Sequence, residues 1–180
     1  MAISSTEALD LLTRGTITVK GRMPWSSNVT LLAEVALDST CVRAVYKPER
    51  GERPLWDFPS GLYKRELAAY LFSEALGWGL VPPTIVREGP HGEGSLQLFV
   101  EAEFEQHWFT LREDARHRER LQKICVYDFV ANNADPLPDA LAALLDADEQ
   151  QALRVRAKAL ADYARFPEDR SGRHYPWPLV

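Results

Sequence analysis

The chain has 180 residues, with 21 Lys and Arg against 26 Asp and Glu, so its formal net charge is −5. Hydrophobic residues make up 46%, charged residues 26% and aromatic residues 10%, which are values of a globular domain rather than a disordered or fibrous chain. The mild acidity argues against a nucleic-acid-binding protein, which usually carries a basic face. No apolar run approaches the roughly 18 residues of a membrane span, so we expect no membrane insertion.

The N-terminus and the cysteines favour a cytoplasmic protein. The first residues lack the basic head and long apolar core of a secretory signal peptide. The two cysteines, Cys41 and Cys125, have neither metal-ligand spacing nor the pattern of a disulfide framework. We therefore expect both to be reduced thiols.

The first part of the chain predicts a short helix followed by strands. Ser4 and Glu7 have the spacing of a capping box, and Gly15 is expected to end the helix. Three strand-like runs follow, over 16–20, 29–37 and 41–46, the last two joined as a hairpin. Pro48 is a natural stop for the third run, and a polar surface loop is expected over 49–59.

From Ser60 the apolar spacing becomes helical, with a stripe formed by Leu62, Leu67, Tyr70, Leu71 and Ala75. Gly77 and Gly79 are expected to end this helix. Two extended segments follow, over 81–86 and 95–100. The order helix, strands, helix, strands predicts an α+β fold, with an antiparallel sheet and a helix packed on one face.

The second part of the chain is predicted to be helical. A polar, hinge-like stretch over 101–105 separates it from the first part, which indicates an N-terminal lobe of residues 1–101 and a helical lobe of residues 102–180. Helices are expected over 113–133, 139–145 and 149–164, and the apolar tail 174–180 is expected to pack on the body.

Lys47 and Glu66 are the first candidate functional pair. Lys47 ends a predicted strand, and Glu66 lies one turn into the following helix, on a side shared with apolar residues. A lone strand lysine is most often a solvated edge residue. It can also be a phosphate-binding ammonium held by a helix carboxylate, as in protein kinases.

Two further segments are chemical candidates. The loop over 21–28 contains Ser26, Ser27 and Asn28, which could cradle phosphates, although it has no glycine-rich phosphate motif and a plain surface loop is as good an interpretation. Asp128 and Asp135 flank an Asn-rich helix end. One interpretation is that the Asn side chains cap the end of this helix. The other is that Asp135 is the base or the orienting group for an attacking hydroxyl. The four histidines and the serines form no protease or hydrolase motif.

Several segments together resemble a known family. They are residues 21–28, Ala44-Val45-Tyr46-Lys47-Pro48, 66–77, 78–84, Gln97-Leu98-Phe99-Val100 and 128–135. They resemble an actinobacterial family described as phosphatidylinositol 3-/4-kinase-like, which is distantly similar to HipA-type kinases. The resemblance covers nearly the whole chain. It implies a protein-kinase-like fold with a small antiparallel β lobe carrying one helix, a hinge, and a mainly helical C-lobe.

The resemblance also implies roles for individual residues. Lys47 matches the lysine that contacts nucleotide phosphates, and Glu66 matches its helix partner. Ser26, Ser27 and Asn28 match the loop over the phosphates. Adenine would bind through backbone groups in the hinge, at Phe99, Val100 and Glu101. Asp135 matches the catalytic-loop aspartate, and the implied cofactors are ATP and magnesium.

One departure from the family pattern bears on activity. The family pattern continues after its aspartate with a metal-binding segment, whereas here Asp135 is followed directly by Pro136 and no Asp-x-Gly occurs later. Either the segment is truly deleted, which leaves a non-catalytic nucleotide-binding pseudokinase or scaffold, or the chain as printed omits it. We favour the second, and expect the 180 residues as they stand to be inactive because magnesium lacks its main carboxylate.

The acceptor substrate is not identified by the sequence. No polybasic run or basic amphipathic face favours a lipid, so we expect a protein or small-molecule acceptor. Transfer of AMP rather than phosphate remains an alternative, because kinase-like folds can host either reaction.

Overall fold

The computed structural model describes residues 3–24, 26, 28–53, 60–103, 105–131, 151 and 155. Ser27, Asp135 and the junction between Asp135 and Pro136 lie outside the described residues, as do the helix predicted over 139–145 and the tail 174–180. Of the helix predicted over 149–164 only residues 151 and 155 are described, and both are helical.

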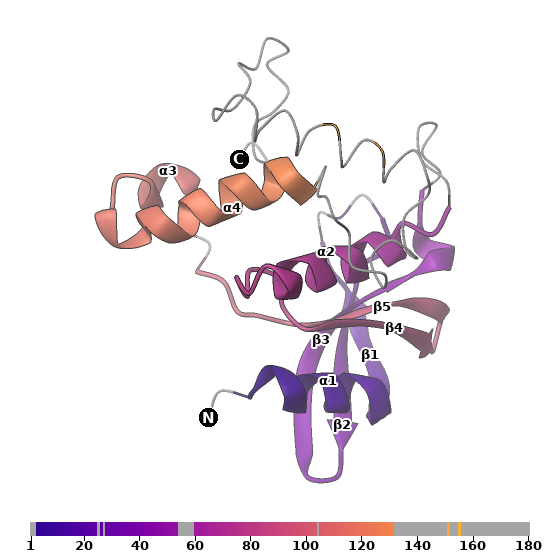
Figure 1. Cartoon of the computed structure of the whole chain (residues 1–180). Helices are drawn as coiled ribbons and strands as arrows, with labels where there is room; N and C mark the ends of the chain where they lie inside the picture. Colours follow the sequence, from indigo (N-terminus) through magenta and orange to yellow (C-terminus); the bar gives the residue numbers. More distant parts are fainter. Residues whose placement is uncertain are drawn as a thin grey trace.

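Five strands form one antiparallel sheet with the order β1-β2-β3-β5-β4 (Figure 1). They are β1 (Thr16–Arg22), β2 (Leu31–Leu37), β3 (Thr40–Pro48), β4 (Thr84–Gly89) and β5 (Gly92–Leu98). The described helices are α1 (Ser5–Arg14), α2 (Tyr63–Ala75), α3 (Trp108–Leu111) and α4 (Arg118–Ala131), with short 3-10 turns η1 (Glu49–Gly51) and η2 (Ala115–His117). The α+β class and the antiparallel sheet expected from the sequence are confirmed.

The two faces of the sheet are set by the alternation of side chains along each strand. One face carries the fully buried residues of the main core, which are Ala33, Val35, Ala44, Tyr46 and Leu96. The opposite face, here called the Lys47 face, carries Lys47, Val45 and Glu34, together with the β5 residues Ser95 and Gln97 that pair with Lys47 and Val45. Strand register therefore separates an apolar face from a face with charged and polar groups.

Helix α1 covers the core face. Its N-terminus has the predicted capping box between Ser4 and Glu7, and its residues Leu11 and Leu12 belong to the main core. Only a glycine fits directly after the helix, at Gly15, because a Cβ there would lie 2.6 Å from both the Leu11 carbonyl oxygen and a Val35 methyl group. Arg87 of β4 donates to the carbonyls of Leu12, Thr13 and Gly15 at 2.9, 2.8 and 3.0 Å, which caps the helix C-terminus.

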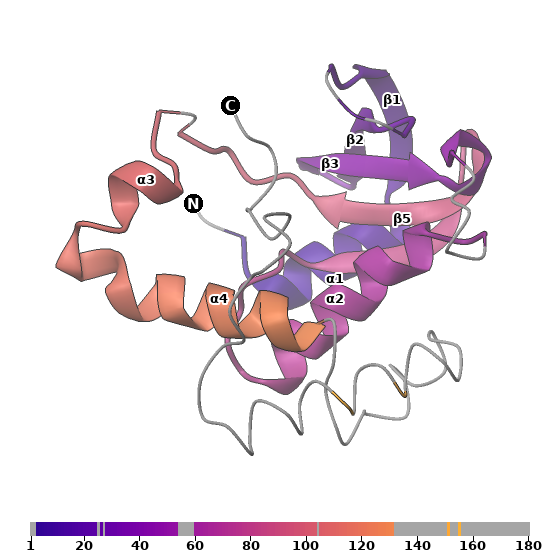
Figure 2. The same cartoon turned by 90° about the horizontal axis from the view of Figure 1, so that it is seen from above.

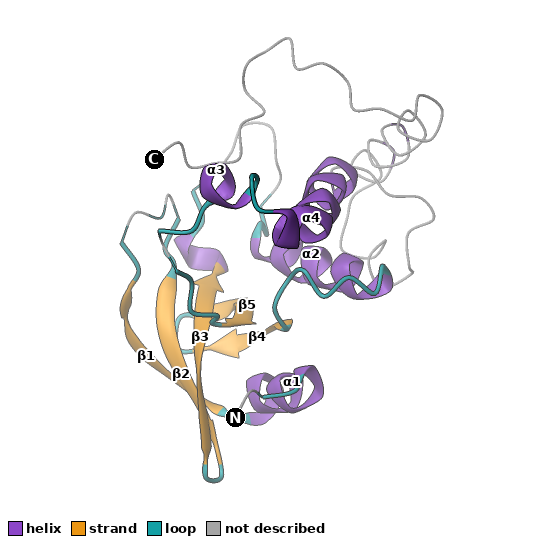
Figure 3. Ribbon diagram, turned by 90° about the vertical axis from the view of Figure 1, so that its left-hand side faces the viewer, coloured by secondary structure: helices purple, strands orange, loops and turns teal. Residues whose placement is uncertain are grey.

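Helix α2 lies on the other side of β4 and β5 from α1 (Figures 1 and 3). The sequence predicted a helix packed on one face of the sheet, and the structure has a helix on each face, α1 on one and α2 on the other. Of the predicted apolar stripe only Tyr70 is buried, and the other buried residues of the helix are Tyr63, Ala68, Phe72 and Ser73. The stripe was misjudged because α2 packs on two sides, against the sheet and against α4.

The contact between α2 and α4 forms a second small core. Tyr127 of α4 packs its ring 5.3 Å from that of Phe72, and its hydroxyl donates to the Ala69 carbonyl at 2.6 Å. Figure 2 shows α4 running beside α2. The single helix predicted over 113–133 is instead a turn at 115–117 followed by α4, because Asp114 accepts from the Arg116 N–H and starts the turn locally.

Candidate functional site

Lys47 is the next-to-last residue of β3, with Tyr46 and Pro48 buried on the opposite face. It pairs across the ladder with Ser95 of β5. The neighbouring position on β5 is Gly94, where a Cβ would lie 2.4 Å from the Lys47 carbonyl oxygen and 2.7 Å from the Pro48 Cα. Two strands that approach this closely hold the Lys47 backbone in one place.

Glu66 lies one turn into α2 and forms an ion pair and hydrogen bond with the Lys47 ammonium. Each of the two side chains is about one-third exposed, at 34%. The sequence-predicted pair is thus brought together, and its ammonium is held at the boundary between the sheet and solvent.

The start of α2 is fixed by contacts that the sequence did not indicate. The carboxylate of Glu52 accepts the N–H groups of Gly61 and Tyr63, and the Tyr63 hydroxyl donates to Glu93 of β5. Burial, and secondarily the hydrogen bond to Glu93, raise the pKa of Tyr63 above its ordinary value. Glu52 lies eleven positions before Tyr63, outside the capping positions of the helix, so no local sequence pattern points to it.

Ser26 and Asn28 lie in the β1–β2 loop, and their side chains form hydrogen bonds with other residues of the chain. The Ser26 hydroxyl donates to the Asn28 carbonyl at 2.7 Å, and the Asn28 side-chain oxygen accepts the Arg53 N–H at 3.0 Å. These side chains therefore shape the loop and attach it to the segment after β3. A phosphate bound by this loop would therefore contact loop N–H groups as well as these side chains.

The predicted hinge residues follow β5 and remain attached to β3. The Phe99 N–H donates to the Arg43 carbonyl at 3.0 Å, and the Arg43 guanidinium lies 4.9 Å from the centre of the Phe99 ring. Arg43 also forms an ion pair with Glu101, while Val100 is 60% exposed. Arg43 shares the Lys47 face, so β3 is the common support for Lys47 at one end and the 99–101 segment at the other.

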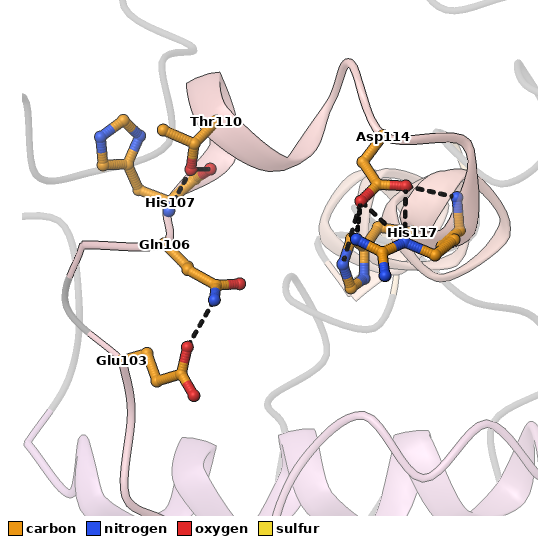
Figure 4. Close-up of polar contacts among 7 residues, drawn as sticks. Glu103, Gln106, His107, Thr110, Asp114 and His117 are labelled. Carbon is orange, nitrogen blue, oxygen red and sulfur yellow. Dashed lines mark hydrogen bonds and ion pairs between the residues drawn. The ribbon is translucent and has the colours of Figure 1, made fainter.

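The chain beyond the hinge is held by local contacts. Figure 4 shows Gln106 turned toward Glu103, Thr110 toward His107, and Asp114 toward His117. Each contact joins residues three positions apart. These contacts are local, so each helps to shape its own turn of the segment.

The described residues do not contain a metal centre. No group of three or more His, Cys, Asp or Glu side chains within these residues is placed to hold a metal ion. Asp135 falls outside them, and the side chain of Asp128 is not described. The described helices also include none that is long and apolar enough to cross a membrane.

Comparison with known proteins gives one close sequence match. A stretch of 92 residues is 55% identical to Protein Rv2133c of Mycobacterium tuberculosis (strain ATCC 25618 / H37Rv). The match covers 51% of this chain and 33% of the relative, so it spans about a third of the relative's length. No family model matches the chain, and no solved structure matches it.

Proposed function

We propose that the chain binds ATP on the Lys47 face of the sheet and works as a protein-kinase-like phosphotransferase on a protein or small-molecule acceptor. The observation that carries the proposal is the ion pair between Lys47 of β3 and Glu66 of α2. In protein kinases a lysine of the third strand binds the nucleotide phosphates and is oriented by a glutamate of the helix that follows. The third strand and the next long helix supply the pair here as well.

The charge arrangement suits a phosphate ligand. A lysine ammonium has three N–H donors, so an ammonium bound to Glu66 retains two for phosphate oxygens. Its partial burial strengthens such bonds relative to those of a fully solvated lysine. The β1–β2 loop is attached by Asn28 to the segment directly after β3, which places it beside the same strand end.

The adenine ring of ATP would bind to the segment after β5. Because the Phe99 N–H is engaged with Arg43, we assign the adenine contact to the Phe99 carbonyl and to backbone groups of Val100 and Glu101. Asp135 is proposed as the group that accepts the proton of the acceptor hydroxyl. The described residues offer no group of three or more side chains that could hold the magnesium that the resemblance implies.

Titration calorimetry with ATP and magnesium tests the binding proposal. We expect wild-type protein to bind, and Lys47→Ala to bind roughly 10- to 100-fold more weakly, the value of a hydrogen bond to a charged group. Lys123→Ala is the control, because Lys123 forms an ion pair with Glu119 on α4 rather than on the sheet. Absence of binding by the wild type, or equal affinities for the two variants, would overturn the proposal.

A non-catalytic nucleotide-binding protein is the second candidate, favoured by the absence of an Asp-x-Gly segment after Asp135. Incubation of the protein isolated from its native source with ATP, followed by mass spectrometry of the products, separates the candidates, because the 180 residues as they stand are expected to be inactive. Added phosphate indicates phosphoryl transfer, and added nucleotide indicates AMP transfer. Binding without either product supports the non-catalytic candidate. Asp135→Asn should abolish either reaction and leave ATP affinity close to that of the wild type.

A further inference from the structure

Residues 49–53 connect the end of β3 to the region before α2 and make contacts in two directions. The first is toward the helix. The two carboxylate oxygens of Glu52 accept the N–H groups of Gly61 at 2.9 Å and Tyr63 at 2.6 Å. Leu62, the residue at the N-cap position, has no side chain that can accept such bonds. Glu52 therefore caps α2 from outside the helix, where a negative charge also favours the helix dipole.

The second direction is toward the β1–β2 loop. The Gly51 carbonyl accepts the Val29 N–H at 2.9 Å, and the Arg53 N–H donates to the Asn28 side chain at 3.0 Å. Gly51 permits this approach, because a Cβ at that position would lie 2.5 Å from the Val29 Cβ. Residues 51–53 therefore bond the loop through their backbone and the helix through the Glu52 side chain.

We propose that Glu52 is a positioning residue that fixes the start of α2 so that Glu66 faces Lys47, and that it ties the β1–β2 loop to that helix. Glu66 lies three residues after Tyr63, so the position of the Tyr63 N–H sets where the first turn places Glu66. Lys47 lies five residues before Glu52 and is fixed by the sheet. The consequence for nucleotide affinity rests on the proposed function, whereas the geometry of the Lys47–Glu66 pair does not.

The direct test uses Glu52→Ala, Glu52→Gln and the control Glu49→Gln, which removes a charge from an exposed residue of the same segment. Lysine ammonium signals are recorded by NMR in nucleotide-free protein and assigned with Lys47→Arg. We expect a slowly exchanging Lys47 signal in the wild type and in Glu49→Gln. It should disappear in Glu66→Gln and in Glu52→Ala, and weaken in Glu52→Gln, which keeps one acceptor oxygen.

Backbone hydrogen exchange identifies a purely local role. Glu52→Ala should speed exchange at the Gly61 and Tyr63 amides, since their acceptor is gone. If these amides exchange faster while the Lys47 signal stays as in the wild type, Glu52 is only a local cap and the proposal is wrong. If Glu52→Ala does not fold, the same comparison is made with Glu52→Gln, whose Lys47 signal must then be weaker than that of Glu49→Gln.

Titration with ATP adds the functional consequence. We expect Glu52→Ala to bind ATP roughly fivefold more weakly than the wild type, the equivalent of a lost helix cap, and Glu49→Gln to bind as the wild type does. If the wild type does not bind ATP, the proposed function fails, while the Lys47 signal still decides the role of Glu52. Equal ATP affinity in a Glu52→Ala protein that has lost its Lys47 signal would overturn the link to nucleotide binding.

Discussion

Among the residues that the structure describes, the ion pairs Lys20–Glu34 and Lys47–Glu66 both involve the sheet but join different elements. Lys20 of β1 and Glu34 of β2 are 2.6 Å apart and connect neighbouring strands that a ladder of backbone hydrogen bonds already holds together. Lys47 and Glu66 connect a strand to a helix that has no backbone ladder with it. The strand register places Glu34 and Lys47 on the same face of the sheet.

Exposure makes the two pairs energetically similar. The side chains are 45% and 41% exposed in the Lys20–Glu34 pair and 34% in both members of the other. Ion pairs this open to water contribute only about 0–1 kcal/mol to stability. The difference between the pairs is therefore in what they orient, and only Lys47–Glu66 depends on the placement of a separate helix.

Gly94 and Gly21 give the largest expected contrast between the two regions. An added Cβ at Gly94 meets the backbone of Lys47 and Pro48, whereas Gly21, next to Lys20, has no atom within 4 Å of that position. We expect Gly94→Ala to lower the free energy of unfolding by about 2–3 kcal/mol, since strand backbone must move, and Gly21→Ala to change it by less than about 0.5 kcal/mol. Urea unfolding measures both, and similar midpoints for the two variants would contradict the expected contrast.

Tyr127→Phe should act on one pair only. It removes the hydroxyl that donates to the Ala69 carbonyl in the middle of α2, which should cost about 1 kcal/mol of unfolding free energy. Because the contact holds α2 and not β1 or β2, the Lys47 ammonium signal should weaken while that of Lys20 stays constant. An equal change in both signals would show that the two pairs are not independent.

Double-mutant cycles sharpen the comparison at a smaller scale. Coupling between Lys47 and Glu66, and between Lys20 and Glu34, is measured from the unfolding free energies of the Lys→Met and Glu→Gln variants. Both coupling energies should lie below about 1 kcal/mol and decrease with added salt. A Lys47–Glu66 coupling several times larger would mean that the pair stabilises the fold, which would weaken the argument for a ligand-binding role.

Local signals in the sequence were enough for the first helix and the strand hairpin, whereas the central pair was suggested mainly by the family resemblance. Ser4 and Glu7 form the expected capping box, and β2 and β3 form the expected hairpin, with Asp38 in the left-handed region at its turn. Strand alternation and helix spacing gave only a weak indication that Lys47 and Glu66 meet, and the ion pair between them confirms that they do. The signals for the capping box and the hairpin lie within a few residues of the features that they predict.

Contacts between distant segments were not predictable in this way. The Arg87 guanidinium reaches carbonyls more than 70 positions earlier in the chain, and the Glu52 carboxylate caps a helix that begins eleven residues later. Neither residue type at those positions is unusual for a surface. The phosphate role of Asn28 stays a prediction, and the sequence did not indicate that its side-chain oxygen also accepts the Arg53 N–H and so helps to fold the loop.

Asp114 and Arg116 form a third pair, which is the most local of the three. The Arg116 guanidinium donates to the Asp114 carboxylate at 2.6–3.1 Å, and the Arg116 N–H donates at 2.9 Å. These bonds, with the nearby His117 as a weaker cause, lower the pKa of Asp114 to about 2 (Figure 4). Because the pKa is lower in the folded chain, the stabilisation is complete above the ordinary value and is lost as pH falls toward 2.

The Asp114 titration is the smallest expected effect and shows why a shifted pKa is a poor guide to the functional pair. Carboxyl-selective NMR should give a midpoint near 2 in the wild type, and Arg116→Gln should move it toward the ordinary 3.8. His117→Gln should move it less. A midpoint that Arg116→Gln leaves unchanged would contradict this assignment of the cause. Arg116 lies only two residues from Asp114, so the contact that causes this large pKa shift does not orient a second helix or strand. The Lys47–Glu66 pair, in contrast, joins a strand to a helix.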